Sequence, residues 1–90
     1  MALGAIFEVA GMSQAQYEQV KGKVLPDNSP APGLLYHAAG PSETGWTVVE
    51  VWESQEALNL IFQERIAPAL QEVGATAQPR FFEVVNTISR

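Results

Sequence analysis

His37 is the only histidine in this chain of 90 residues, and it lies in the short apolar segment formed by residues 34–40. Histidine is the side-chain type that changes charge near neutral pH, so His37 is the first candidate for a general base. A phenol or an enol is the kind of group that it would deprotonate. The alternative, and the more common role, is a structural histidine that makes a hydrogen bond at a sheet edge or a subunit seam. The strand face that His37 occupies separates the two interpretations.

Trp52 and Asn86 are the candidates for ligand contacts among the expected strand residues. Trp52 ends an apolar strand, where its ring can form a wall for a planar ligand or simply pack in the core. A ring contact of that kind is worth about 0.5–1.5 kcal/mol beyond burial. Asn86 lies among Phe82, Val84 and Ile88. An amide on an apolar strand face needs a partner, either a ligand oxygen or a backbone group near the strand end.

Two glutamates, Glu8 and Glu50, are also expected on strands. If both were buried on neighbouring strands, the pair would share a proton and could supply a base. In the alternative, each carboxylate pairs with Arg80 or Arg90, or reaches solvent. The sequence leaves both interpretations open.

No other catalytic or cofactor-binding pattern stands out. One histidine, no cysteine and dispersed carboxylates make no recognisable set of metal ligands. The sequence has no Walker A motif, no Gly-x-Gly-x-x-Gly motif and no nucleophile elbow. Tyr17 and Tyr36 are expected to pack in a helix and a strand. We therefore expect no metal and no cofactor.

The composition indicates a single domain, residues 1–90, with a surplus of apolar surface. The chain is 47% hydrophobic and 17% charged, and it has no cysteine for a disulfide that would strengthen a small core. A second copy of the chain is the simplest partner for the surplus. The net charge of −5 argues against nucleic-acid binding. Without a membrane-spanning stretch or a signal-peptide pattern, a cytoplasmic protein is expected.

Strand and helix patterns alternate along the chain. Strands are expected where β-branched and aromatic residues cluster between turns, at residues 3–9, 34–40, 46–53 and 80–88. Helices are expected after the N-cap residues Ser13 and Ser54, where apolar residues recur every three to four positions. Pro26 ends the first helix. Pro68 either kinks the second helix or begins a further short one, and Gly74 closes it.

The resulting order, β-α-β-β-α-β, predicts a ferredoxin-like α+β fold, in which two helices cover one face of a four-stranded antiparallel sheet. Alternate residues of the third strand point to opposite faces, with Trp46, Val48, Glu50 and Trp52 on one side. The other set, Thr47, Val49, Val51 and Glu53, is also largely apolar. A sheet with one wet face would alternate between apolar and polar residues, so both faces are expected to be buried. The chain is therefore predicted to form a homodimer through the sheet face.

The order of elements and several short segments resemble the dimeric α+β barrel superfamily, specifically the small antibiotic biosynthesis monooxygenase-like proteins. The likeness is sharpest at His37-Ala38-Ala39-Gly40-Pro41, Gly45-Trp46, Val51-Trp52-Glu53-Ser54 and Glu64-Arg65-Ile66-Ala67-Pro68-Ala69-Leu70. Monooxygenases of this family oxidise phenolic polycyclic compounds with dioxygen and without metal or flavin. Related members degrade haem and need a histidine on the second helix. This chain has no histidine there, which argues against haem degradation.

The resemblance implies a small-molecule cleft between helices and sheet for an apolar or aromatic compound. If the protein is an enzyme, the expected chemistry is cofactor-independent, monooxygenase-like oxidation or enolisation. His37 is then the base, Trp52 and Phe62 form the walls, and Asn86 is a further ligand contact. The alternative is a non-catalytic binding or assembly module of the same fold. A cavity with His37 or Asn86 facing into it favours the first hypothesis, and a filled interior favours the second.

Overall fold

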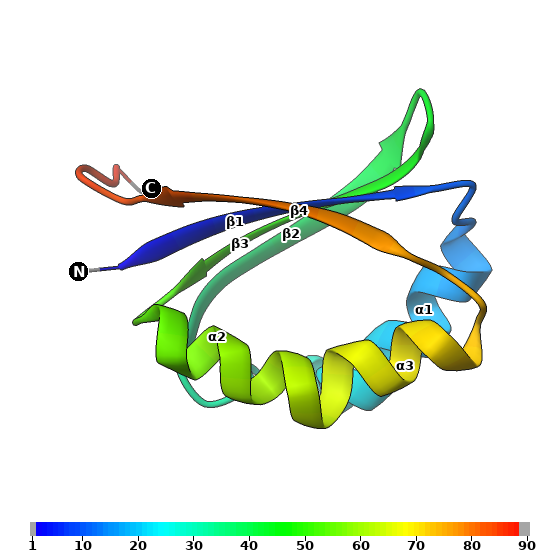
Figure 1. Cartoon of the computed structure of the whole chain (residues 1–90), viewed down its shortest axis with the longest axis horizontal. Coiled ribbons are helices and arrows are strands. Elements are labelled where there is room, and N and C mark those ends of the chain that lie inside the picture. Colours follow the sequence, from blue (N-terminus) through cyan, green and yellow to red (C-terminus); the bar gives the residue numbers. More distant parts are fainter. Residues whose placement is uncertain (1, 89–90) are drawn as a thin grey trace.

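Four antiparallel strands form one sheet, and the helices lie together on one of its faces (Figure 1). The structure is a computed structural model that describes residues 2–88. The strands are β1 (Leu3–Ala10), β2 (Leu34–Ser42), β3 (Gly45–Trp52) and β4 (Ala77–Glu83). The helices are α1 (Gln14–Val24), α2 (Gln55–Ile61) and α3 (Ala67–Glu72). The strand order β2-β3-β1-β4 confirms the predicted ferredoxin-like α+β fold.

Both predicted helix starts are confirmed by their capping hydrogen bonds. The Ser13 hydroxyl accepts from the Gln16 backbone N–H (3.2 Å), and the Gln16 side chain accepts from the Ser13 N–H (2.9 Å). The Ser54 hydroxyl accepts from the Ala57 N–H (3.1 Å). Such caps satisfy backbone donors that the first helical turn leaves free, and they fix where each helix begins. Ser13 therefore determines which residues of α1 turn toward the sheet.

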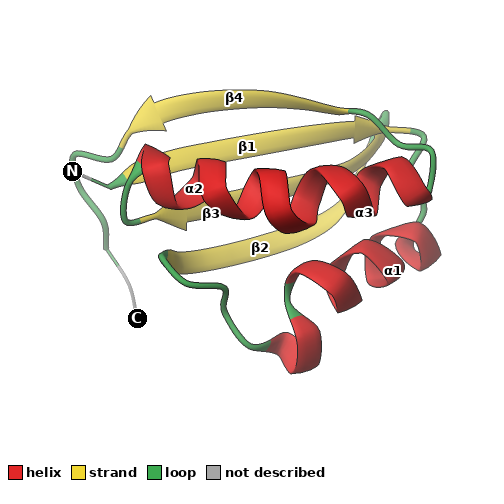
Figure 2. Cartoon of the chain, turned by 60° about the horizontal axis from the view of Figure 1, so that its bottom comes forward, coloured by secondary structure: helices red, strands yellow, loops and turns green. Residues whose placement is uncertain are grey.

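The second helical segment is an almost continuous rod that lies across one face of the sheet, in front of the strands in Figure 2. A π-helical turn, Phe62–Ile66, joins α2 to α3, and Pro68 lies in the first turn of α3. Proline has no backbone N–H, so the first turn of a helix accommodates it without losing a hydrogen bond. Pro68 therefore lies in the first turn of a further short helix, as the second expectation had it, although the helical segment continues without a break.

The last strand differs from the prediction of residues 80–88, because β4 begins at Ala77 and ends at Glu83. Its partner β1 begins at Leu3, which lies opposite Glu83, and only the bond from the Val84 N–H to the Ala2 carbonyl follows (3.0 Å). Within residues 2–88 no further backbone hydrogen bond joins β1 to the residues after Val84. Because β4 begins earlier than predicted, it includes Pro79. An edge strand tolerates a proline because the backbone on one of its sides makes no ladder hydrogen bonds.

The two faces of the sheet have different surroundings. Trp46, Glu50 and Trp52 of β3 are buried on the side of the helices. The opposite side, which we call the open face, has no helix over it (Figure 1). Tyr36 and Phe82 lie on the open face and remain 56% and 49% exposed. The sheet therefore has one face in the hydrophobic core and one largely apolar face that no helix covers. Residues 84–88 border this open face beside Tyr36 and Val51.

Gly33 and Gly22 offer a matched pair of substitutions for testing the junction between β2 and α2. Gly33 has a φ of +86°, and an added Cβ would lie 2.6 Å from the Cβ of Ala57. Gly33→Ala should lower the free energy of unfolding by more than about 1 kcal/mol. Gly22 lies within α1 with nothing within 4 Å of an added Cβ. Gly22→Ala should therefore raise the free energy of unfolding by about 0.5–1 kcal/mol. Urea unfolding at one protein concentration measures both, and a stabilising Gly33→Ala would contradict this packing.

Candidate active site

His37 lies on the helix side of β2, directly opposite Glu50 of β3. Its Nδ1 lies 2.8 Å from Oε2 of Glu50. A carboxylate can only accept, so Nδ1 carries the hydrogen, and in the neutral imidazole Nε2 is then left as an acceptor. The Tyr17 hydroxyl donates to that Nε2 over 2.6 Å, and the Trp52 indole N–H donates to Oε1 of Glu50 over 2.9 Å. Three hydrogen bonds therefore link Tyr17, His37, Glu50 and Trp52 in one chain.

Glu50 is the central, buried residue of this hydrogen-bonded series. It is 4% exposed, and Trp52 beside it is fully buried at 0%. A buried carboxylate is costly unless donors satisfy it, and here each oxygen receives one hydrogen bond. Through this pairing Glu50 holds the imidazole of His37 in one tautomer and one orientation.

Tyr17 is held by its hydrogen bond and by a neighbouring ring. Its ring lies nearly coplanar with His37, which it meets end to end through the hydrogen bond, and it stacks on Trp46 with 5.1 Å between centroids. Burial raises the pKa of Tyr17 above its usual value, and the nearby carboxylates of Glu18 and Glu50 raise it further. The hydroxyl therefore keeps its proton at neutral pH and is the donor toward His37.

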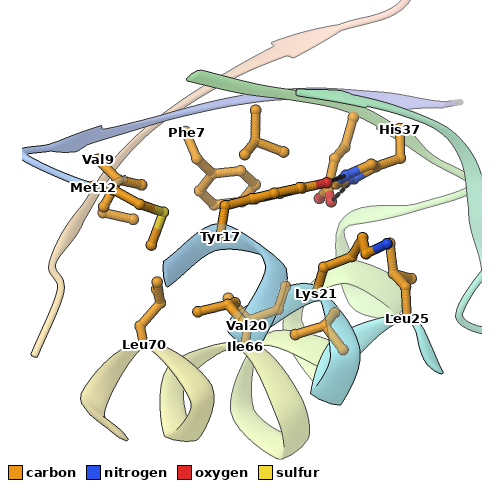
Figure 3. Close-up of a pocket in the computed structure, with 14 residues that line it drawn as sticks. Phe7, Val9, Met12, Tyr17, Val20, Lys21, Leu25, His37, Ile66 and Leu70 are labelled. Atoms are coloured by element: carbon orange, nitrogen blue, oxygen red, sulfur yellow. Dashed lines mark hydrogen bonds and ion pairs between the residues drawn. The ribbon is translucent and has the colours of Figure 1, made fainter. Parts of the chain in front are cut away.

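Two hollows meet at the Tyr17–His37 pair. The first, which we call the inner cavity, lies between the sheet and helices α1 and α3 (Figure 3) and has a volume of about 60 Å³. Its walls are almost entirely apolar: they are formed by Phe7, Val9, Met12, Tyr17, Val20, Lys21, Val24, Leu25, His37, Val48, Glu50, Ile66, Leu70 and Ala77.

The second hollow, which we call the outer groove, lies between α1, the loop that follows it and the start of β2. It has a volume of about 480 Å³ and a mixed polar and apolar lining. That lining consists of Tyr17, Glu18, Lys21, Leu25, Asn28, Ser29, Pro30, Leu34, Leu35, Tyr36 and His37. Tyr17, Lys21, Leu25 and His37 belong to both hollows. The Tyr17–His37 hydrogen bond is therefore part of the partition between them.

The structure brings some of the expected site residues together and separates others. Trp52 reaches His37 through Glu50 and is not among the residues that line either hollow. Phe62 is half-buried and stacks on Phe7, a wall of the inner cavity, with 6.4 Å between ring centroids. Asn86 lies beyond the end of β4, exposed, in a separate hollow that includes Val51 of the open face.

Glu50 and Tyr17 take part in ways that the sequence did not indicate. Glu50 was expected to act, if at all, with Glu8, whereas the structure pairs it with His37. Glu8 instead lies 3.2 Å from the guanidinium of Arg80, and Arg90 lies outside the described residues. Tyr17 was expected only to pack. The signal that could have linked Glu50 to His37 is the register of the β2–β3 hairpin.

Within residues 2–88 no group of three or more His, Cys, Asp or Glu side chains is arranged to hold a metal ion. Among the helices of that same range, none combines the length and the apolar character needed to cross a membrane.

Solved structures share this fold over nearly the whole chain. SnoaB, a cofactor-independent oxygenase from Streptomyces nogalater, matches with a TM-score of 0.71 and 14% identity, covering 99% of this chain and 98% of SnoaB. A Chloroflexus aurantiacus protein provisionally described as an antibiotic biosynthesis monooxygenase matches with 0.68 and 15%, covering 99% and 98%. A similarly described Caulobacter crescentus protein matches with 0.64 and 18%, covering 94% and 91%. No protein-family model and no curated protein matches the sequence.

The chain thus has the fold of the antibiotic biosynthesis monooxygenase-like proteins, as the resemblance of its segments implied. At these identities the likeness is one of fold, and one fold supports many activities. The activity therefore has to be argued from the residues around His37.

Proposed function

We propose that this protein oxidises a small apolar or aromatic compound that carries a phenol or an enol, without a cofactor and with His37 as the general base. The observation that carries the proposal is the position of His37: its imidazole is bound to a buried carboxylate on one side and borders two hollows on the other. The printed description of SnoaB as a cofactor-independent oxygenase supports the same class of chemistry.

The hydrogen-bonded chain suits proton removal. When His37 gains a proton at Nε2, the Glu50 carboxylate at Nδ1 stabilises the imidazolium that forms. The substrate becomes an electron-rich anion that can react with dioxygen directly. In the overall reaction the substrate loses two hydrogens, one from its hydroxyl and one from the carbon that gains an oxygen atom, and the other oxygen atom leaves as water. The substrate supplies the electrons, so the reaction balances without a further reductant.

We also infer that two copies associate through their open faces. Within strands β1–β4, Glu8 and Arg80 are the charged residues on that face, and they neutralise each other. The rest of the face is apolar or uncharged and includes the exposed rings of Tyr36 and Phe82. A surface that presents nearly no net charge can meet a copy of itself without repulsion, and burial of its apolar groups favours association.

Oxygen uptake tests the proposed activity. Hydroxynaphthalenes and β-diketones, as phenol and enol substrates, should consume dioxygen and incorporate ¹⁸O from ¹⁸O₂. His37→Ala should lower turnover by about a hundredfold or more. It should also lower the free energy of unfolding by about 1–3 kcal/mol, because it leaves Tyr17 and Glu50 without their partner. The control Glu43→Gln, in the exposed hairpin turn, should change neither. Unchanged turnover in a folded His37→Ala variant would rule out His37 as the base.

A further inference from the structure

The inner cavity is too small for an aromatic ring. In another protein, an engineered apolar cavity of about 150 Å³ holds one benzene molecule. The inner cavity here measures about 60 Å³, and protein interiors are packed too densely to expand by a ring's volume without cost. An aromatic substrate therefore does not fit between helices and sheet in this structure, and only a small alkyl branch has room there.

The outer groove, by contrast, has the size and lining of a small-molecule site. Its volume of about 480 Å³ lies within the range of roughly 300–1,000 Å³ that is usual for such sites. Leu35, 57% exposed, offers apolar surface to a ring, whereas Tyr36 of the lining belongs to the open face. The ammonium of Lys21 hydrogen-bonds to Asn28 (2.7 Å) and pairs with the carboxylate of Glu18 (3.4 Å), which lines the same groove. An ammonium has three N–H donors, so one remains for an anion formed in the groove.

We propose that the hydroxylated ring of the substrate binds in the outer groove, where Tyr17 takes the proton of the ring hydroxyl and passes its own proton to His37. This inference rests on the proposed function and assigns the place of the substrate and the residue that touches it. The ligand class is a phenol of one or two rings, with at most a small alkyl group directed into the inner cavity.

The proton path follows from the hydrogen bonds already present. Nε2 of His37 is occupied by the Tyr17 hydroxyl (2.6 Å), so a substrate hydroxyl reaches the base through that oxygen. The Tyr17 oxygen donates one hydrogen bond and still has lone pairs that accept another. As the substrate O–H bond breaks, a new O–H bond forms on Tyr17. The original Tyr17 proton forms an N–H bond at Nε2, leaving a phenolate and an imidazolium beside Glu50.

The test uses 4-nitrophenol as the probe, because its phenolate absorbs visible light and its neutral form does not. Ser29→Trp fills the outer groove alone, and Ala77→Leu fills the inner cavity alone. Ser29→Trp should weaken binding by at least about tenfold, whereas Ala77→Leu should change it less than about twofold. Ser42→Trp, the same change at an exposed site in the hairpin, is the matched control and should leave binding unchanged. Pro30→Trp, at another residue that lines the outer groove alone, serves as a second blocking variant with the same expected loss of binding.

Tyr17→Phe separates binding from proton transfer. It removes the oxygen and keeps the ring, so it should bind the probe within about threefold of the unchanged protein, but the bound probe should lose its phenolate band. The inference is overturned if Ala77→Leu is the variant that weakens binding, if the unchanged protein shows no saturable binding, or if Tyr17→Phe keeps the phenolate band. Interior binding together with His37-dependent oxygen uptake would overturn this inference alone, whereas His37-independent uptake would overturn the proposed function.

Discussion

Replacing Trp52 with Ala should lower the free energy of unfolding by about 3–5 kcal/mol. Trp52 is fully buried, so the substitution leaves a large cavity, and it also removes one of the two donors to the Glu50 carboxylate. A loss of this size is a large part of the roughly 5–15 kcal/mol that stabilises most domains. Chemical unfolding followed by circular dichroism measures it at a fixed protein concentration. A loss below about 1 kcal/mol would contradict the packing seen here.

The two tryptophans provide a matched control for the hydrogen-bond part of this effect. Trp52→Phe keeps most of the ring but removes the N–H that Glu50 accepts, and it should cost about 1–3 kcal/mol. Trp46 is also buried, but within residues 2–88 its indole N–H has no hydrogen-bond partner. Trp46→Phe therefore removes a donor that is already unsatisfied and should cost less than Trp52→Phe. The reverse order would show that Glu50 does not depend on Trp52.

Introducing a charge on the open face should separate the proposed dimer. Val49 lies in the middle of β3, between Ile6 of β1 and Ala38 of β2. An aspartate at this position would be buried against the second copy without a partner, at a cost of several kcal/mol. Val49→Asp should therefore raise the dimer dissociation constant by more than about a hundredfold. Sedimentation velocity across a range of concentrations measures the shift.

Thr44→Asp is the control for this variant, because it adds the same charge at the exposed hairpin turn. It should sediment like the unchanged protein. Two results would refute the proposed interface: an unchanged protein that is a folded monomer at micromolar concentration, or a Val49→Asp variant that remains dimeric. The melting temperature of the unchanged protein should also rise with its concentration, as expected when folding and association are linked.

The sequence by itself determined the order of the elements, because those signals are local. Ser13 and Ser54 mark the helix starts through their own capping bonds, and the spacing of apolar residues shows which segments are helices. The alternation of residues along β3 also predicted correctly which side chains share the helix side of the sheet and which share the open face. The end of β4 was not a local property, because it depends on the pairing of β4 with β1, a strand that is distant in the sequence.

Only the tertiary structure decided the candidate site, and the hairpin shows why. A five-residue loop at residues 41–45 would set Gly40 opposite Trp46 and His37 opposite Val49, on the open face. In the structure Ser42 pairs with Gly45, so His37 lies opposite Glu50 on the helix side. A shift of one residue moves every side chain of a strand to the other face. The packing of the whole sheet therefore determines the length of this turn, and with it the face of the sheet on which His37 lies.

The contact between Tyr17 and His37 could not be predicted from the sequence for a related reason. The periodicity of α1 indicates that Tyr17 turns inward with Val20 and Val24, but not which strand residue it meets. That meeting depends on how α1 packs against the sheet, including the stacking of Tyr17 on Trp46. Local patterns specify which side of each element is apolar, whereas contacts between distant elements, such as Tyr17 with His37, exist only once the layers have packed together.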